Sequence, residues 1–182
     1  QQFWGSGEFA LPFGDFEVNI TVPADHVLEA TGNLLNRNEV FTATQLARYA
    51  QAEKSFDKPV IVVTQAEAEV TEKGFSDKKK TWKFKAENVR DFGISTSRKF
   101  IYDAMAVQLG SKTAMAISLY PKEGNPLWEE YSTRIVAHTL KSYSSHTFDY
   151  PYPKAISINA EDQGMEYPMI CFNPGRAEED GT

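Results

Sequence analysis

The stretch Gln163-Gly164-Met165-Glu166-Tyr167-Pro168-Met169-Ile170 places one acidic residue, Glu166, inside an apolar segment typical of a strand. A carboxylate in such a segment must be paired, hydrated in a cleft or functional, because burying an unpaired charge is costly. Gly164 lets another backbone approach closely, and Pro168 cannot donate to a strand ladder, so both favour an edge strand. The residues alone leave two interpretations open: an edge strand whose Glu166 faces water, and a ligand-binding strand.

The residues before this stretch predict a strand followed by a helix. Met115, Ile117 and Leu119 alternate toward one face, and Pro121 ends that strand. Asn125-Pro126 then suits a helix start, since Asn is a good N-cap and Pro fits the first helical position. The helix should fade by residues 144–145. Its expected apolar stripe consists of Leu127, Tyr131, Ile135, Val136, Leu140 and Tyr143.

After the helix, the sequence predicts extended structure up to the tail. Tyr150-Pro151-Tyr152-Pro153 cannot be helical. Ile156 and Ile158 are expected to begin another strand, and residues 164–172 a further extended run. Asn173-Pro174-Gly175 should turn the chain at the end of that run.

The first hundred residues are predicted to be β-rich. Residues 16–22 alternate with a period of two, and residues 60–64 form a short β-branched run typical of a buried strand. Residues 82–86 predict a strand with one wet face. Between the last two, residues 65–80 are expected to be a solvated hairpin tip. Residues 42–55 form the one helical candidate in this half.

Composition indicates an ordinary globular chain. Hydrophobic residues make up 41% and charged residues 24% of its 182 residues. A composition shift near Gly110 predicts a boundary between a segment 1–110 and a segment 111–182. The net charge of -6 disfavours nucleic acid or an anionic membrane as a partner, because both require a basic surface. No apolar stretch approaches the roughly 20 residues that span a membrane.

The sequence contains no pattern for a metal site or a catalytic nucleophile. None of the three histidines, His26, His138 and His146, has a second histidine three or four residues away, so no helical zinc pair exists. We therefore predict no metal site within this chain. The single cysteine, Cys171, is expected to be a small buried hydrophobe rather than a catalytic thiol.

The motif at residues 164–169 resembles the G-x-M-E-N exopeptidase motif of gluzincin aminopeptidases, the family that includes aminopeptidase N. It is more closely similar to the G-G-M-E-Y-P variant of bacterial members. Other segments resemble the family in the same order along the chain: residues 11–16, 22–26, 30–32, 86–92 and 150–153. The resemblance thus spans nearly the whole chain.

The resemblance implies an α+β, β-rich fold. In that family, an N-terminal β-sandwich-like domain precedes a thermolysin-like catalytic domain, of which residues 111–182 would supply the opening β-α-β segment. Glu166 matches the glutamate that binds the free α-amino group of a peptide substrate. Gly164 and Met165 match the backbone that lines the scissile peptide. Two positions depart from the motif, since Gln163 replaces its first glycine and Tyr167 its final Asn; the second departure matches the bacterial variant.

The resemblance also implies a zinc enzyme of which this chain is a fragment. The family's H-E-x-x-H zinc motif is absent, and the chain ends just before the point where it would be expected. We therefore expect zinc in the full-length parent, and neither zinc nor peptide hydrolysis in the isolated chain. The expected partners are a peptide with a free N-terminus and the missing remainder of the catalytic domain.

A surface that normally packs on that missing remainder should be exposed in the isolated chain and drive self-association. The bacterial look-alikes favour a secreted or periplasmic origin. The alternative function is a non-catalytic binding or interaction module derived from such a protein.

Overall fold

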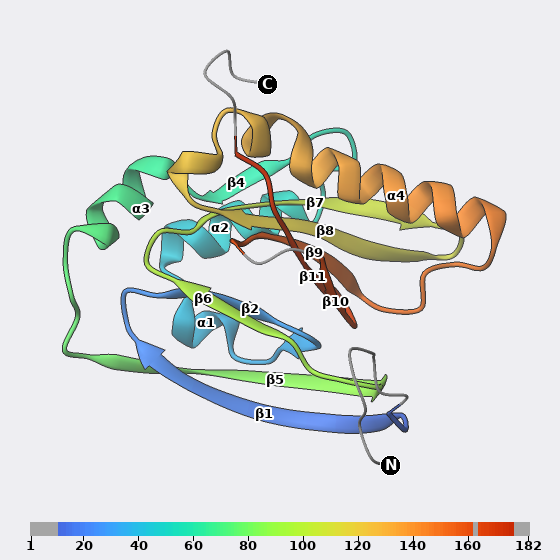
Figure 1. Cartoon of the computed structure of the whole chain (residues 1–182), viewed down its shortest axis with the longest axis horizontal. Coiled ribbons are helices and arrows are strands. Elements are labelled where there is room, and N and C mark those ends of the chain that lie inside the picture. The colour runs from blue at the N-terminus through green and yellow to red at the C-terminus, as the bar shows by residue number, and fades with distance from the viewer. Residues whose placement is uncertain (1–10, 162–163, 177–182) are drawn as a thin grey trace.

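The structure is a computed structural model that describes residues 11–161 and 164–176. Its largest sheet has six strands in the order β10-β11-β9-β8-β7-β4 (Figure 1). These strands are β4 (Val60–Val63), β7 (Ile101–Leu109), β8 (Lys112–Tyr120), β9 (Lys154–Asn159), β10 (Met165–Tyr167) and β11 (Ile170–Asn173). The short β10 stands at one edge of this sheet, where β11 is its single partner among the described strands.

A β-α-β unit forms the centre of this sheet. The strands β8 and β9 are parallel, and the chain between them forms the 3-10 turn η1 (Lys122–Gly124), the π-helical turn η2 (Trp128–Ser132) and the helix α4 (Thr133–His146). A parallel pair needs such a crossover. The helix α4 lies along one face of the sheet (Figure 1), where Ala137 and Leu140 pack on Met105 and Val107.

Two smaller sheets, together with α1 and α2, cover the opposite face of the six-stranded sheet. They are a three-stranded sheet in the order β1-β5-β3 and a two-stranded sheet of β2 and β6. The bounds of these elements and of α3 are β1 (Gly14–Pro23), β2 (Val27–Ala30), β3 (Asn33–Leu34), α1 (Arg37–Val40), α2 (Ala43–Ala52), α3 (Gln65–Glu72), β5 (Lys79–Val89) and β6 (Ile94–Ser97). Trp82, Phe84 and Leu28 meet Tyr102 and Ile158 of the large sheet in the main hydrophobic core. The helix α3 packs beside η2 instead, in a separate hydrophobic cluster of Ala68, Ile101, Tyr120 and Trp128.

The mixed α+β, strand-rich class is confirmed, and so are most of the predicted elements. Strands lie at residues 16–22, 60–63, 82–86 and 115–119. The predicted helix at residues 42–55 is α2, and Thr42 caps it through a reciprocal bond pattern with Gln45.

The hairpin tip predicted at residues 65–80 is wrong, because its first half is the helix α3. Thr64 accepts a bond from the Glu67 backbone N–H, and the Glu67 carboxylate accepts one from the Thr64 N–H. The flanking strands also do not pair with each other, since β4 pairs with β7 and β5 with β1 and β3. No hairpin therefore exists for this segment to close.

The single extended run predicted at residues 164–172 is also wrong. It consists of two strands, β10 and β11, joined by a turn at Pro168 and Met169. Met169 has a φ of 67°, which reverses the chain there. Pro168 thus lies in the turn of the hairpin rather than within the edge strand.

The boundary predicted near Gly110 falls in the turn between β7 and β8. These two strands pair along their whole length, from Ile101 with Tyr120 to Leu109 with Lys112. The two predicted segments therefore contribute strands to one sheet, and their division into domains stays a prediction.

Candidate functional site

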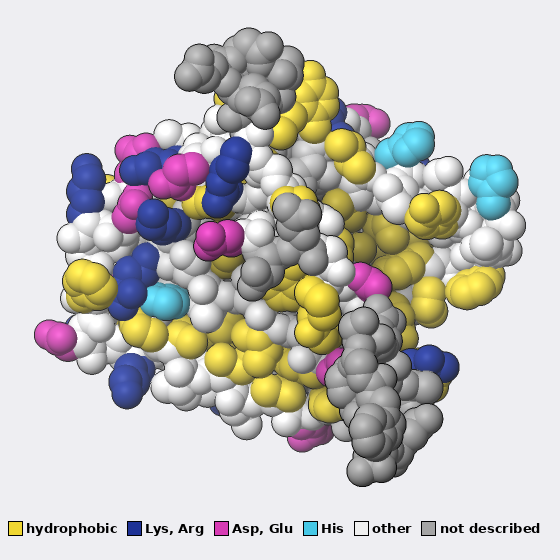
Figure 2. Space-filling model, in the orientation of Figure 1, with side chains coloured by type: hydrophobic (Ala, Val, Ile, Leu, Met, Phe, Trp, Pro, Cys, Tyr) yellow, Lys and Arg dark blue, Asp and Glu magenta, His cyan; other side chains and the backbone are white. Residues whose placement is uncertain are grey.

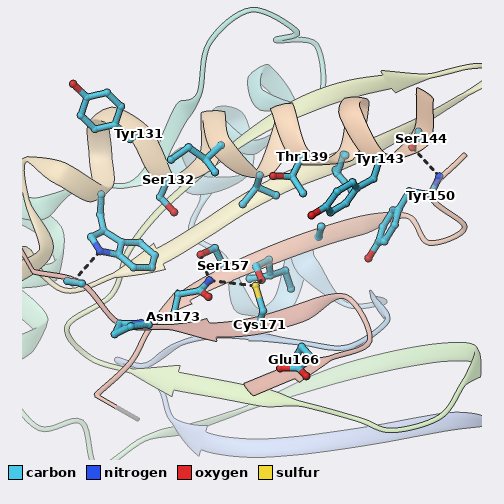
Figure 3. A pocket seen from close by; sticks show the side chains of 18 of the residues that line it. Tyr131, Ser132, Thr139, Tyr143, Ser144, Tyr150, Ser157, Glu166, Cys171 and Asn173 are labelled. Atoms are coloured by element: carbon cyan, nitrogen blue, oxygen red, sulfur yellow. Dashed lines mark hydrogen bonds between the residues drawn. The ribbon is translucent and has the colours of Figure 1, made fainter. Parts of the chain in front are cut away.

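A large groove lies between α4 and the strands β9, β11 and β10 (Figure 3). Its volume is about 830 Å³. Three residues of the predicted apolar stripe, Tyr131, Ile135 and Tyr143, line it and are 48%, 59% and 70% exposed. Phe148, beyond the end of α4, adds a further exposed ring. Figure 2 shows hydrophobic side chains gathered at the surface beneath this helix.

The groove is apolar on its helix side because α4 is packed toward β7 and β8. The buried part of α4, at Ala137 and Leu140, sits on those strands, whereas the exposed side chains of the stripe line the groove over β9 and β11. An exposed apolar surface of this kind marks a binding or packing surface.

The floor of the groove is polar, and it comes from alternate residues of two parallel strands. Ser157 on β9 pairs with Cys171 on β11, so both side chains point to the same face. The Asn173 amide donates to Ser157 Oγ at 2.8 Å and to Cys171 Sγ at 3.3 Å (Figure 3). The Cys171 thiol donates to the Ile156 carbonyl oxygen at 3.3 Å.

This environment does not activate Cys171 as a nucleophile. Burial raises the pKa of its thiol, and the nearby charge of Glu166 raises it further, against a lowering by Asn173. A reactive cysteine requires the opposite shift. Its apolar neighbours predicted a small buried hydrophobe, but Cys171 is half-buried at the groove floor, because it shares a face of the sheet with Ser157.

Glu166 lies at the rim of the groove on the edge strand β10 (Figure 3). It pairs with Cys171 across the hairpin, which turns its side chain toward the groove floor. The side chain is exposed. Among the residues that the structure describes, no cation forms an ion pair with it.

The other predicted site residues are not gathered around Glu166. Met165 and Tyr167 occupy the opposite face of β10, where Tyr167 packs edge-on against Phe172 with ring centroids 6.0 Å apart. Gly164 precedes the strand with a φ of 70°, and no atom lies within 4 Å of the position a Cβ would take. Gln163 lies outside the described residues.

The sequence signals did not single out Ser157 or Asn173. Each is an ordinary polar residue at a strand or turn position, and only the parallel pairing of β9 with β11 brings them together. The one available signal was the alternation of polar residues with Ile156 and Ile158. It indicates which side chains of β9 share a face, but it does not show that β11 lies beside β9.

The described residues do not fit a zinc site. They contain no group of three or more His, Cys, Asp and Glu side chains that could hold a metal ion. His138 and His146 are both exposed on α4, and His26 bonds Thr96 at 3.0 Å far from the groove. No helix in the described part of the chain is long and apolar enough to cross a membrane.

No protein-family model matches the sequence, and no curated protein matches it significantly. Solved structures do match its fold. An M1 zinc metallopeptidase from Deinococcus radiodurans superposes with a TM-score of 0.56 at 18% sequence identity, over 90% of this chain and 31% of that chain. A mutant M1 zinc metallopeptidase from the same organism, bound to the substrate Tyr-Ser-Ala, gives 0.54 with the same identity and coverage.

A two-domain mutant M1 zinc metallopeptidase bound to L-tryptophan gives a TM-score of 0.53, again at 18% identity, over 90% of this chain and 31% of that one. The chain therefore has the fold of one part of these peptidases, which supports the gluzincin-like fold predicted from the motif. It spans 31% of their length.

Proposed function

We propose that this chain is part of a zinc aminopeptidase, in which β10 binds the N-terminal end of a peptide and Glu166 binds its α-ammonium group. One observation carries the proposal: the Glu166 carboxylate stands on an edge strand at the rim of a groove, with no ion-pair partner among the described residues. The likeness to M1 zinc metallopeptidases and the match of residues 164–169 to the bacterial G-G-M-E-Y-P variant support it.

An edge strand with an acidic side chain suits the recognition of a chain end. Backbone groups along the free side of β10 can pair with an extended peptide. The carboxylate adds a charge-assisted bond to an ammonium group, which a peptide offers only at its N-terminus or on lysine. The pair of contacts thus fixes both the direction and the position of the peptide.

Glu166 needs a cover for this bond to be strong. An ion pair in water contributes about 0–1 kcal/mol, whereas two charges 4 Å apart attract by about 4 kcal/mol at an effective dielectric constant of about 20. Because the Glu166 side chain is exposed, an ion pair with it in the described chain would contribute only the smaller of these two energies. We propose that the rest of a longer protein covers the groove, excludes water from Glu166 and so strengthens its ion pair with the peptide.

The apolar wall of the groove supports such a cover. Tyr131, Ile135 and Tyr143 present it, and the Trp128 Nε1–H donates to the Gly175 carbonyl oxygen at 3.1 Å at the groove's other end. The M1 peptidases that share this fold have more than twice as much chain beyond the shared part, because it is 31% of their length. We propose that a segment of this kind packs on the wall.

Zinc in such enzymes activates a water molecule and polarises the scissile carbonyl. Because the described residues do not fit a zinc site, no step of hydrolysis is assigned to them. The share of this chain is to bind and orient the peptide, and we expect the isolated chain to be inactive.

The groove also favours a second candidate function, a non-catalytic interaction module. Its apolar wall could hold a partner protein without any metal. The gene sequence that follows the codon of Thr182 separates the two functions. An H-E-x-x-H motif within a few dozen codons is expected for the peptidase, together with zinc in the encoded protein, and its absence would leave the interaction module.

A second experiment tests the proposed role of Glu166. Isotope-labelled protein encoded by the complete gene is titrated with L-leucinamide and, in parallel, with N-acetyl-L-leucinamide. We expect Glu166 to respond only to the compound with the free amine. Glu17, an exposed carboxylate on β1, serves as the control through Glu17→Gln, which should bind normally, whereas Glu166→Gln should not. Equal binding of both compounds would contradict the role.

A further inference from the structure

A fully buried carboxylate lies beneath the first turns of the α4 region, away from the groove floor. Asp103, in the middle of β7, has no exposed surface. The Tyr120 hydroxyl donates to its Oδ2 at 2.7 Å, and the Thr133 hydroxyl donates to its Oδ1. No ion pair joins Asp103 to a cation of the described chain. Within the described residues, the side-chain partners of this carboxyl group are therefore hydroxyl groups.

The hydroxyl contacts continue from Asp103 to the groove. Thr133 Oγ1 lies 2.7 Å from Ser118 Oγ, which lies 2.8 Å from Ser132 Oγ. Ser132 lines the groove beside α4 (Figure 3). A continuous chain of hydrogen bonds thus joins the buried carboxylate to a surface side chain.

Each hydroxyl has one proton, so the chain has a direction. When Asp103 is ionised it can only accept, so Thr133 gives its one proton to Asp103 and cannot donate to Ser118, and Ser132 can then donate to Ser118. When Asp103 gains a proton, its own O–H can donate to Thr133. Thr133 is then able to donate to Ser118, the direction that its geometry supports, and Ser118 to donate to Ser132. Ser132 then accepts from Ser118 and is free to donate into the groove.

The last hydroxyl of this chain belongs to an irregular turn. Ser132 ends the π-helical turn η2, and Trp128 begins it. π-helical turns are often found at functional sites. Trp128 also lines the groove and bonds Gly175, so its indole N–H can report a change within this turn.

We infer that Asp103, Thr133, Ser118 and Ser132 form a proton-responsive hydrogen-bond chain that switches Ser132 between donating inward and donating into the groove. One proton taken from solvent by Asp103 reverses the chain, and no other atom is exchanged. The inference concerns a positioning device and does not depend on the proposed peptidase function.

The electrostatic surroundings place this switch near neutral pH. Burial raises the pKa of Asp103 to about 7, although the bonds from Thr133 and Tyr120 lower it. On the helix side, Glu129 raises this pKa and Arg134 lowers it. On β8, burial and Asp103 raise the pKa of Tyr120, which stays a neutral donor.

The neighbours from β4 and α3 that pack around Tyr120 are the apolar Ile61 and Ala68. The raised pKa means that the folded chain holds this proton more tightly than the unfolded chain. Its contribution to stability is present at low pH and is lost as the pH rises from about 4 through about 7.

The test follows the indole N–H signal of Trp128 in the complete 182-residue chain while the pH rises from about 5 to about 8, a range that spans the titration of a group near neutrality. A spectrum of Trp128→Phe assigns the signal. We expect it to shift with a midpoint near 7. In Asp103→Asn the shift should vanish, because the amide mimics the protonated carboxyl and cannot titrate.

Matched variants separate this device from other titrating groups. His138→Gln, on the exposed side of α4, should leave the midpoint unchanged. Tyr120→Phe removes one donor to the ionised form and should raise the midpoint by about one pH unit. Ser132→Ala should keep the midpoint and weaken the response of Trp128. A shift that persists in Asp103→Asn, an unmoved midpoint in Tyr120→Phe, or no shift in the wild-type chain would overturn the inference.

Discussion

The two faces of the six-stranded sheet are covered to different degrees. On one face, Tyr102, Ile158 and Ile170 are almost completely buried beneath the N-terminal strands and helices. On the other, α4 covers β7 and β8 and leaves a groove over β9 and β11. The closed face holds the core of the fold, and the open face is the part of the sheet available to a ligand or to more protein.

Two strand glutamates show the same contrast. Glu29 on β2 is 3% exposed, and Lys154 Nζ lies 2.5 Å from its carboxylate while the Tyr102 hydroxyl donates to it at 2.8 Å. Glu166 on β10 is exposed and has no ion-pair partner among the described residues. A buried glutamate with all its partners present serves the fold, whereas an accessible one without a cation is free to bind a ligand.

The largest effect is expected on the closed face, from removing the cation that Glu29 needs. Lys154→Met should cost about 3–5 kcal/mol of unfolding free energy, because it leaves a buried carboxylate without its partner. Denaturant unfolding at neutral pH measures this loss. Adding Glu29→Gln to Lys154→Met should recover much of this stability. A loss below about 1 kcal/mol in Lys154→Met alone would show that Glu29 does not depend on its buried cation, and would contradict the contrast with Glu166.

A truncation on each face compares the two apolar surfaces directly. Ile158→Ala, in the closed core at 1% exposure, should cost about 2–5 kcal/mol. Ile135→Ala, 59% exposed on the groove wall, should change stability by about 0.5 kcal/mol at most. Unfolding curves of both variants give the comparison, and equal losses would show that the groove is closed in solution.

Self-association should arise from the open face. We expect Ile135→Glu to weaken it by about tenfold, which corresponds to about 1.4 kcal/mol, because a charge on the wall opposes apolar contact. Val70→Glu introduces the same change at a residue 73% exposed on α3, outside the groove, and should have little effect. Sedimentation velocity over a concentration series measures both. A weakening by Val70→Glu alone would place the contact elsewhere.

The smallest effect on stability is expected for Glu166. Because its side chain is exposed and has no ion-pair partner among the described residues, Glu166→Gln should change the unfolding free energy by about 0.5 kcal/mol at most. A loss of several kcal/mol would make this residue part of the fold rather than of a binding site.

The sequence was informative where one local rule determines the structure. The alternation at residues 16–22 gave β1, and Thr42 gave the start of α2. The same kind of rule, the capping box of Thr64 and Glu67, is present before α3, but the polar composition of residues 65–80 led to the prediction of a hairpin tip. Local signals thus predicted most elements, and the helix α3 was missed although a local signal, its capping box, was present.

Partners that lie far apart in the sequence were beyond local rules. Nothing in the sequence around Glu29 indicated that it pairs with Lys154, 125 residues away. The only glutamate that the sequence marked as unusual was Glu166. The apolar stripe of α4 was predicted from its helical spacing. That spacing does not indicate that only half of the stripe packs on the sheet while the other half lines the groove. The position of Glu166 at a sheet edge was predicted from Gly164 and Pro168, although Pro168 proved to lie in the turn.

The most direct test of the account is the kinetics of aminoacyl p-nitroanilide hydrolysis by the protein encoded by the complete gene. Wild type, Glu166→Gln and the control Glu17→Gln are compared. We expect Glu166→Gln to lower kcat/KM by about 100-fold, because losing one partner of a desolvated charge pair costs about 2–5 kcal/mol, and Glu17→Gln to leave it unchanged. Equal kcat/KM values for Glu166→Gln and wild type would contradict the role of Glu166 as the anchor of the substrate's N-terminus.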